Sequence, residues 1–303
     1  MENLHDSIVN SSHFQKFQVD DLLFVELTCV TNEIRSEIWS HTNYFAYVLG
    51  GKKMWKTLKN EYLIKNRDLI FVKKGAMSVY QYFEDQFYVL LVFIPDDFIA
   101  KVIKKHGVTS KSLKPVLSEE TDNVIMLDPN EIFSAYFDSL LLYFRQPNPP
   151  AKSLLRTKLE ELILSMVHYG TNLEIAHYFS DVCSNENLSM QHVMEANFHK
   201  NLSLSEFARL CARSLSGFKR DFSNLYGSSP GRWLTEKRLE YSKYLLEISS
   251  MNIDEIIEES GFANMSHYIR AFKEKFGITP YQFRKTEQRS QVDSLNHTIS
   301  NPL

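Results

Sequence analysis

An internal repeat in the last third of the chain constrains its fold more than any other feature. The segment LSLSEFARLCARSLSGFKRDFSNLYGSSPGRW at 202–233 is matched by MNIDEIIEESGFANMSHYIRAFKEKFGITPYQF at 251–283. At an offset of 50, Phe218, Arg220, Phe222, Gly227, Pro230 and Trp233 correspond to Tyr268, Arg270, Phe272, Gly277, Pro280 and Phe283. A repeat of this kind indicates one supersecondary unit used twice.

Each copy is patterned as two short helices joined by a tight turn. In the first copy, the i, i+3, i+4, i+7 spacing of Leu204, Phe207, Ala208 and Cys211 predicts an amphipathic helix. A turn at Ala212-Arg213 and a capping Ser214 then predict a second helix, which Gly227 ends. Its expected buried stripe is Leu215, Phe218, Phe222 and Leu225, and in the second copy Tyr268, Phe272 and Phe276. This is a helix-turn-helix arrangement.

The second helix of each copy exposes a face of small and basic residues. We predict that these residues contact DNA: Ser216, Gly217, Lys219, Arg220, Ser266, His267, Ile269 and Arg270. Small residues permit close approach to DNA, and Arg binds guanine or phosphate in a bidentate manner. Between the copies, Ser229-Pro230 starts a helix with a stripe of Leu234, Tyr241, Leu245 and Ile248. A rigid linker of this kind would let both helices enter successive major grooves, about 34 Å apart.

The second copy closely resembles the signature of the AraC/XylS transcription regulators in the stretch GFANMSHYIRAFKEKFGITPYQFR at 261–284. The stretches SLSGFKRDF at 214–222 and RLEYSKYLL at 238–246 match the same family. The resemblance implies a seven-helix module that binds promoter DNA and acts on RNA polymerase. It also places Ser216, Lys219, Arg220, Ser266, His267 and Arg270 at base- or phosphate-contacting positions. Two positions depart from the family: Ala212 replaces the usual turn Gly, and Ile257 replaces a small Ala.

Residues 20–95 have the pattern of a β domain. Short apolar stretches at 22–30, 44–49, 52–58, 69–72, 77–83 and 87–94 are separated by turn signals. Closely spaced short strands predict a sandwich or small barrel, with a hairpin at Gly50-Gly51. The resemblance implies a cupin-like fold here, so the expected class is α+β: a cupin-like β-sandwich or barrel, a helical pair, and an all-α C-terminal domain.

Two amphipathic helices are predicted after the β domain. Their stripes run over 132–144 and 155–167, and the segment QPNPP at 146–150 separates them. Two interpretations remain open: the stripes pack on their own domain, or they form a homodimer surface. The segment RTKLEELIL at 156–164 resembles the dimer helix of type III secretion activators, a branch of the family in which a protein partner controls the N-terminal domain.

The N-terminal half lacks the pattern of a metal enzyme. A cupin metal site needs a His-x-His with a further His and Glu, whereas His5, His13, His41 and His106 are scattered. We therefore predict no metal, no cofactor and no catalytic residue. An effector, either a small molecule or a protein, is expected at this domain, and Trp55, Tyr80, Tyr82 and Tyr88 are candidate pocket residues. The alternative is a small-molecule-binding or enzymatic cupin-like protein whose helical domain is structural.

Composition agrees with a soluble regulator. The 303 residues carry a net charge of −3, and residues 190–285 hold 14 Lys and Arg against 11 Asp and Glu. The longest apolar run, near 88–95, is far shorter than the roughly 20 residues of a membrane span, and the N-terminus has no signal-peptide pattern. Three distant cysteines, Cys29, Cys183 and Cys211, form neither a disulfide framework nor a zinc site. We expect a cytoplasmic protein with four parts: 1–125 (β regulatory domain), 126–185 (helical, dimerisation), 186–289 (DNA-binding) and 290–303 (polar tail).

Overall fold

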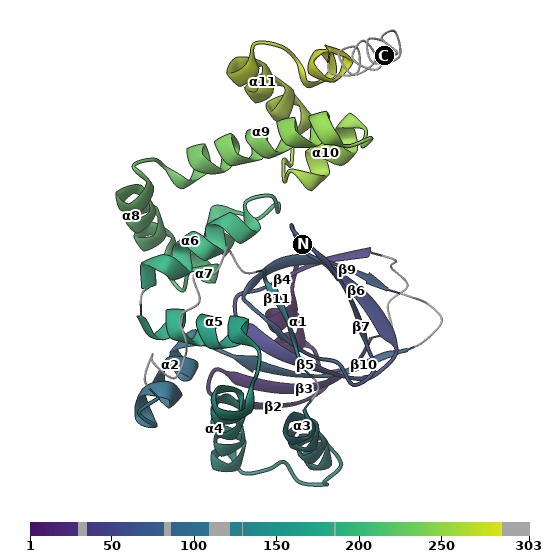
Figure 1. Ribbon diagram of the computed structural model, residues 1–303, viewed down its shortest axis with the longest axis vertical. Coiled ribbons are helices and arrows are strands. Elements are labelled where there is room, and N and C mark those ends of the chain that lie inside the picture. Colours follow the sequence, from purple (N-terminus) through teal and green to yellow (C-terminus); the bar gives the residue numbers. More distant parts are fainter. Residues whose placement is uncertain (30–34, 82–85, 109–121, 129, 185, 287–303) are drawn as a thin grey trace, which may run out of the picture. The chain divides into compact units, whose positions relative to one another are not determined.

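Strands fill the N-terminal part of the chain and helices fill the C-terminal part (Figure 1). The computed structural model describes residues 1–29, 35–81, 86–108, 122–128, 130–184 and 186–286, so the expected polar tail at 290–303 lies outside it. The described residues belong to two compact units: Met1–Ala196 with Ala208–Arg213, and Asn197–Phe207 with Ser214–Leu303. The α+β class expected from the sequence is confirmed.

The strands of the N-terminal unit form two sheets. One has the strand order β1-β4-β9-β6-β7, and the other has the order β11-β8-β5-β10-β3-β2. The strand pairs are antiparallel apart from β1 with β4. The strands are β1 (Glu2–Asn3), β2 (Gln15–Val19), β3 (Leu22–Cys29), β4 (Arg35–Ser40), β5 (Asn43–Gly50), β6 (Lys52–Lys56), β7 (Glu61–Lys65), β8 (Leu69–Val72), β9 (Gly75–Gln81), β10 (Phe87–Ile94) and β11 (Val124–Leu127).

The six-stranded sheet is buried on both faces. On β5, Tyr44 and Ala46 point into a core that also takes Trp55 and Val79 from the five-stranded sheet. The alternate residues of β5, such as Phe45, point into a second core on the opposite face. Because successive side chains of a strand alternate between faces, a sheet covered on both sides requires continuous apolar runs, as in β10 with FYVLLVFI.

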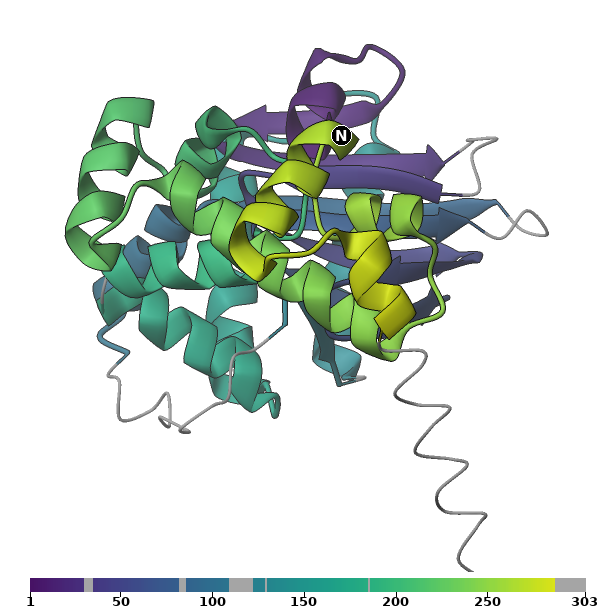
Figure 2. The ribbon, with the colours of Figure 1, turned by 90° about the horizontal axis from the view of Figure 1, so that it is seen from above.

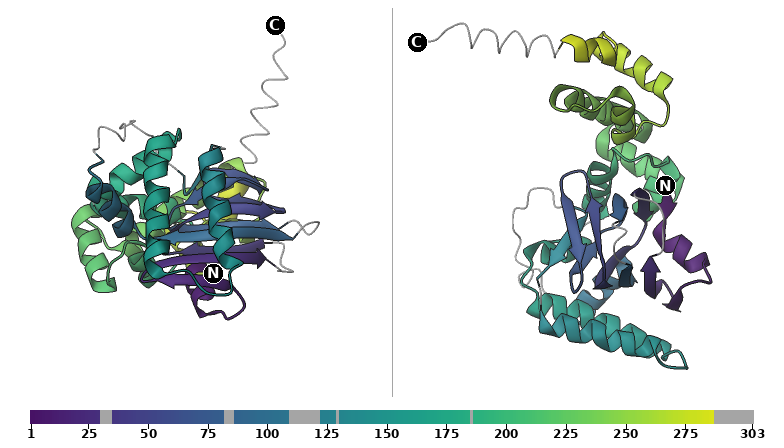
Figure 3. Two further views of the ribbon diagram at one scale, coloured as in Figure 1. Left: turned by 90° about the horizontal axis from the view of Figure 1, so that it is seen from below. Right: turned by 90° about the vertical axis from the view of Figure 1, so that its right-hand side faces the viewer.

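Helices cover the outer face of the six-stranded sheet (Figure 3). The helical pair predicted from the stripes is present, but its stripes are not a free surface, because Leu155 and Leu162 are 2% and 0% exposed. They pack on the sheet of their own chain, and the Tyr47 ring stacks on Phe137 with centroids 5.0 Å apart. The interpretation in which the pair packs on its own domain is therefore the one observed for these stripes. The covering helices are α2 (Asp96–Lys105), α3 (Glu131–Phe144), α4 (Lys152–Tyr169) and α5 (Leu173–Ser184).

The hairpin predicted at Gly50-Gly51 is wrong. Strand β5 pairs with β8 and β10, whereas β6 pairs with β7 and β9, so the chain crosses from one sheet to the other at this point. Gly51 has φ +73°, and a Cβ on it would lie 2.6 Å from the Gln86 carbonyl oxygen. The glycine is therefore required by a close approach of two backbones at a sheet corner.

Several elements were not predicted from the sequence pattern. They are β1, β2, β4, β7, β11, α2, α5 (Leu173–Ser184), α6 (Glu186–Asn197) and the short helix α1 (Leu4–Asn10). Strands β4 (RSEIWS) and β7 (EYLIK) belong to the five-stranded sheet and carry several charged residues. A strand with one solvated face has few apolar residues, which weakens the signal by which a strand is recognised.

The C-terminal part consists of helices. Figure 2 shows the long α9 between the helices of the first repeat copy and those of the second. The helices are α6 (Glu186–Asn197), α7 (Leu204–Leu210), α8 (Leu215–Tyr226), α9 (Pro230–Ile248), α10 (Ile253–Glu259) and α11 (Met265–Phe276).

Candidate nucleic-acid interface

The first helix of each repeat copy begins with the same two reciprocal hydrogen bonds. The Ser203 hydroxyl accepts from the Glu206 backbone N–H at 3.3 Å, and the Glu206 carboxylate accepts from the Ser203 N–H at 2.6 Å. Asn252 and Glu255 form the equivalent capping box 49 residues later, at 2.9 and 2.7 Å. These bonds satisfy backbone donors that the first turn of a helix leaves without partners. The repeat read from side chains is therefore also a repeat of local structure.

The turns between the paired helices also correspond. Ala212 has φ +52° and Gly261 has φ +81°, so both occupy the left-handed region. The next helix of each copy starts at a side-chain cap: Ser214 accepts from the Gly217 N–H at 3.2 Å, and Asn264 accepts from the His267 N–H at 2.9 Å. Each of these helices, α8 and α11, ends at a left-handed glycine, Gly227 or Gly277. The predicted helix-turn-helix pattern is therefore present in both copies.

Aromatic side chains on one face of α8 and one face of α11 are buried. Phe218 and Phe222 on α8, and Tyr268 and Phe272 on α11, are fully buried. The expectation that Leu215 continues the buried stripe is wrong, because its side chain is 40% exposed at the first position of α8. In the second copy, Phe276 is half-buried and contacts Phe272, with ring centroids 4.6 Å apart.

The predicted DNA-contacting residues lie on the faces of α8 and α11 that point away from the buried aromatic residues. Six of the eight side chains are exposed: Ser216, Lys219, Arg220, Ser266, His267 and Arg270. Gly217 and Ile269 are half-buried, so they approach a ligand less freely. The Arg220 side chain is 73% exposed, and its Nε donates to the Asp221 carboxylate at 3.0 Å. An exposed pair of this kind contributes little stability, so it is easily exchanged for a phosphate or a base.

Helix α9 connects the two copies of the repeat. Its 19 residues span about 28 Å at 1.5 Å per residue, which is close to one turn of B-DNA. Leu234 and Leu245 are buried as predicted, whereas Ile248 is 62% exposed at the last position and does not continue the stripe. The Arg238 guanidinium donates to the carbonyl oxygens of Phe198 and Lys200, both at 2.7 Å. This arginine, whose structural role the sequence pattern does not reveal, links α9 to the segment before α7.

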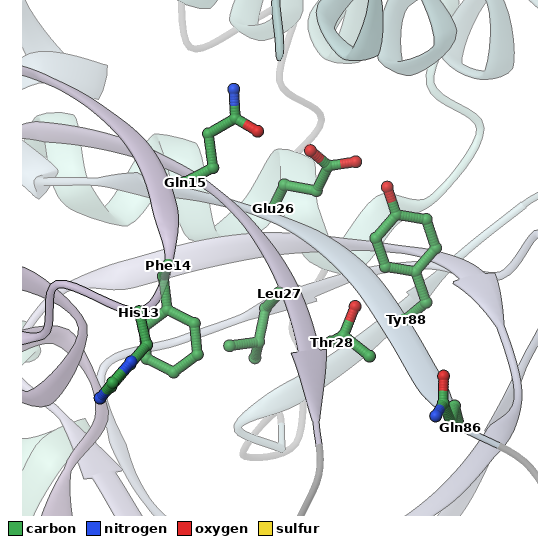
Figure 4. Close-up of a pocket in the computed structure, with 8 residues that line it drawn as sticks. All are labelled: His13, Phe14, Gln15, Glu26, Leu27, Thr28, Gln86 and Tyr88. Carbon is green, nitrogen blue, oxygen red and sulfur yellow. The ribbon is translucent and has the colours of Figure 1, made fainter. Parts of the chain in front are cut away.

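A cavity of 360 Å³ lies between the two sheets of the N-terminal unit. Of the predicted pocket residues, Trp55 lines it, while Tyr80 does not and Tyr82 lies outside the described residues. Tyr88 lines a wider hollow of 880 Å³ at one end of β3, where Gln15, Glu26 and Tyr88 project to the same side of the strand (Figure 4). Burial raises the pKa of the Glu26 carboxyl, and the charge of Arg145 opposes that rise.

The fold brings together two histidines that are far apart in the sequence. His5, Asp6 and His41 place potential ligand atoms within 4.8 Å of one another, a proximity that the sequence pattern did not reveal. Burial is the main cause that lowers the pKa of His41 to about 4, so its imidazole is neutral at pH 7. The Asp6 carboxylate accepts from the Arg209 guanidinium at 2.8 and 3.1 Å. This pairing already satisfies the carboxylate, and we assign no metal to the cluster.

None of the helices described by the structure is both long enough and apolar enough to cross a membrane.

Comparison with known proteins assigns both halves of the chain. Residues 43–178 match the family described as the ExsA N-terminal regulatory domain, and residues 207–286 match a helix-turn-helix domain family. The virulence regulon transcriptional activator VirF of Yersinia enterocolitica is 25% identical over 258 residues, which cover 83% of this chain and 92% of VirF. The HTH-type transcriptional regulator ExsA of Pseudomonas aeruginosa is 23% identical over 238 residues, covering 78% and 84%.

Among solved structures, ToxT from Vibrio cholerae aligns over 88% of this chain and 98% of its own length, with 13% identity and a TM-score of 0.42. At that level of similarity we draw no argument from ToxT. The two family matches cover both the sheet-containing region and the repeat, and each long relative spans both regions. The chain is therefore a DNA-binding transcription regulator that combines an ExsA-type N-terminal regulatory domain with an AraC-type helix-turn-helix domain.

Proposed function

We propose that this regulator activates transcription by placing α8 and α11 in successive major grooves of promoter DNA. The observation that carries the proposal is the equivalence of the two copies, which share capping boxes, left-handed turns and left-handed end caps. Both helices expose an Arg two residues after a buried aromatic. Two residues turn a helix by about 200°, so each Arg faces away from the core. Activation, not repression, is proposed because VirF is named a transcriptional activator.

Arg220 and Arg270 provide the direct test. Replacing either by Ala should cost on the order of 1–3 kcal/mol of specific affinity, because each would lose contacts to a base or a phosphate. The two losses should be nearly additive, since the residues lie about one groove apart and share no DNA contact. The measurement is titration of each variant against DNA selected from a random pool and against single-base variants of that DNA. Arg145→Ala is the matched control, because this exposed Arg lies outside the repeat.

The salt dependence of binding separates two kinds of contact. Loss of a base-reading Arg relaxes the preference over a few base pairs in its half of the site. Loss of a phosphate-contacting Arg weakens binding to all sequences alike and reduces the salt slope by about one. We expect at least one of the two residues to be a base reader. Full affinity in both variants would exclude the proposed docking of α8 and α11.

We further propose a cytoplasmic homodimer that recruits RNA polymerase, has no catalytic activity and is controlled by an effector at the N-terminal unit.

The dimer is supported by apolar side chains outside the buried stripes, because Ile132 and Leu142 on α3 and Leu154 on α4 are 42%, 54% and 40% exposed. Leu142→Glu should yield a folded monomer by light scattering. The control is Leu63→Glu, at an equally exposed site on β7. A parent chain that is monomeric at micromolar concentration would contradict the dimer.

A further inference from the structure

Strand β7, with the sequence EYLIK, is the last strand of the five-stranded sheet. It pairs with β6 along one side, and its other side pairs with no strand that the structure describes. The edge of a sheet offers a row of backbone donors and acceptors to any strand that approaches it. The exposed side chains of β7 include a leucine, because Leu63 is 54% exposed. This edge is therefore a candidate surface for pairing with another chain.

The hydrogen bonds of the β6–β7 hairpin fix which residues turn their backbone to the outer edge. At the hairpin end, the Thr57 N–H donates to the Asn60 carbonyl oxygen at 3.0 Å. Pairs that exchange hydrogen bonds alternate with pairs that do not along an antiparallel ladder. Counted from Asn60, the residues of β7 that turn their N–H and C=O away from β6 are Glu61, Leu63 and Lys65.

The same three residues direct their side chains to the solvent. Glu61, Leu63 and Lys65 are exposed, whereas Ile64 is fully buried in the core between the sheets. The order acid, apolar, base is its own complement when a strand is read in the opposite direction. In an antiparallel pair of two β7 strands centred on Leu63, each Glu61 lies opposite Lys65 of the second copy. Opposite charges in directly facing positions stabilise a strand pair.

The backbone geometry permits this register. Leu63 turns its N–H and C=O to the shared edge in both copies, so the two leucines can exchange two hydrogen bonds. Each Glu61 N–H can donate to the Lys65 carbonyl oxygen of the other copy. The Lys65 N–H is not needed, because it donates to the Asp68 carboxylate at 2.9 Å. A shift by two residues in either direction would place a charged side chain opposite Leu63, so charge selects one register.

The pairing also extends an apolar row on the outer face of the five-stranded sheet. Met54 of β6 pairs with Leu63 on one side and with Tyr80 of β9 on the other, so these three side chains lie in register across the sheet. Residues in register on neighbouring strands point to the same face. Two β7 strands centred on Leu63 would join this row to the equivalent row of the second copy.

We infer that β7 pairs antiparallel with β7 of a second copy of this chain and joins two five-stranded sheets into one. The five residues of β7 are few beside the roughly 20–30 residues per side of a stable interface, so the contact is weak. It is separate from the dimer proposed above and is not populated at micromolar concentration. Copies bound at neighbouring sites on one DNA meet at a much higher effective concentration. That role on DNA, unlike the contact itself, rests on the proposed function.

Disulfide trapping tests the contact and its register. Residues that exchange hydrogen bonds across an antiparallel pair have Cα atoms about 5.5 Å apart, a distance that a disulfide spans. The variant is Leu63→Cys in a chain that also carries Cys29→Ser and Cys183→Ser, while the native Cys211 is 3% exposed and is kept. Under mild oxidation well above micromolar concentration, we expect a covalent dimer on a non-reducing gel.

Met54→Cys in the same chain is the matched control. It lies on the same face as Leu63, but two copies of it would be separated by three strand spacings, about 14 Å. A disulfide cannot span that distance. No covalent dimer from Leu63→Cys would overturn the inference, and equal yields from both variants would overturn the register.

Charge reversal tests whether the edge is self-complementary. In the Leu63→Cys chain, Glu61→Lys brings ammonium groups opposite each other, and Lys65→Glu does the same with carboxylates. Each change alone should weaken the association roughly tenfold. A mixture of the two variants, distinguished by tags of different size, should trap the heterodimer, because both ion pairs are then restored. Trapping that ignores charge reversal, or a mixture that is not rescued, would contradict the pairing of Glu61 with Lys65.

Trapping is measured without DNA, so its result is independent of the proposed function. If the covalent dimer forms as expected in a chain that does not bind selected DNA, the proposed function fails while the contact stands. For the role on DNA, the probe is DNA that carries two copies of the selected site at a series of spacings. Leu63→Glu should bind one copy as the parent does and should lose cooperativity between two, whereas unchanged cooperativity would overturn that role.

Discussion

At the scale of single residues, the left-handed turn positions of the two repeat copies should affect the free energy of unfolding. Ala212 and Gly261 both have a left-handed backbone, which carries an energetic cost for Ala and none for Gly. Ala212→Gly should therefore stabilise the chain by about 0.5–1 kcal/mol, part of the gain being offset by the greater freedom of Gly in the unfolded state. The measurement is the midpoint and slope of urea denaturation.

The reverse substitution at the equivalent site should have a larger effect of opposite sign. A Cβ on Gly261 would lie 2.5 Å from the His199 carbonyl oxygen, so Gly261→Ala adds a backbone clash to the strained φ. We expect a loss of more than 1 kcal/mol. Gly231→Ala is the control, because nothing lies within 4 Å of a Cβ at that helical position. Equal stability of Gly261→Ala and the parent would contradict the turn geometry.

A buried histidine should make stability depend on pH. His199 is 2% exposed, and burial, followed by the charges of Lys200 and Arg238, lowers its pKa well below 6.5. The unfolded chain therefore binds a proton at a higher pH than the folded chain does. The contribution of His199 is fully present above pH 6.5 and falls progressively as the pH drops below that value. His5 and His41 have lowered pKa values as well and act in the same direction.

His199→Gln isolates this contribution. The free energy of unfolding of this variant should fall less steeply than that of the parent between pH 6.5 and 5. His168→Gln, at an exposed position on α4, is the control and should follow the parent. Urea denaturation at a series of pH values gives both slopes, and parallel curves for His199→Gln and the parent would contradict the assignment.

At the scale of elements, a polar cluster fastens α5 to the sheet. The Tyr178 hydroxyl lies 2.6 Å from Asp96 Oδ1 and 2.8 Å from Asn43 Oδ1, and Lys74 donates to Asp96 Oδ2 at 2.6 Å. Burial alone would raise the pKa of Asp96, but the charge of Lys74 and these hydrogen bonds together lower it. Tyr178→Phe removes a hydrogen bond to a charged group and should cost about 1.5–3 kcal/mol. Thermal denaturation checks this, with Tyr169→Phe, 57% exposed on α4, as the control.

The sequence predicts elements well where their determinants are local. The capped helices of the repeat were found because Ser214, Gly227 and the aromatic stripes lie within a few residues of one another. Strand pairing depends on residues far apart in the chain, and Gly51 shows the consequence: a glycine that suggested a hairpin serves a corner between sheets. The stripe over 155–167 was correctly predicted to be helical, but its spacing does not distinguish a dimer surface from a core.

The two candidate sites also differ in whether their determinants lie close together in the sequence. The residues of α8 and α11 that are proposed to contact DNA follow from helical periodicity relative to buried aromatics, which the sequence displays. The cavity follows from the register of β6 with β9 and from the packing of one sheet on the other. Those relations join residues on strands that are not consecutive in the sequence. Trp55 was therefore recognised as a pocket residue by type alone, and Lys53 and Gln81 were not recognised.

At the scale of the whole molecule, the two halves should contribute separately to DNA affinity. The fragment 186–289 contains α7 to α11, whose buried aromatics and capping boxes lie within its own sequence. We therefore expect it to fold by circular dichroism and to bind the selected DNA as a monomer. The full chain should bind more tightly, because the proposed dimer would join two DNA-binding regions and raise the effective concentration of the second after the first has bound. Comparison with full-length Leu142→Glu separates this linkage from any direct contact that the N-terminal half makes with DNA. Linkage predicts that the monomeric variant binds DNA with the affinity of the fragment. An affinity equal to that of the parent chain would instead assign the gain in affinity over the fragment to the N-terminal half itself.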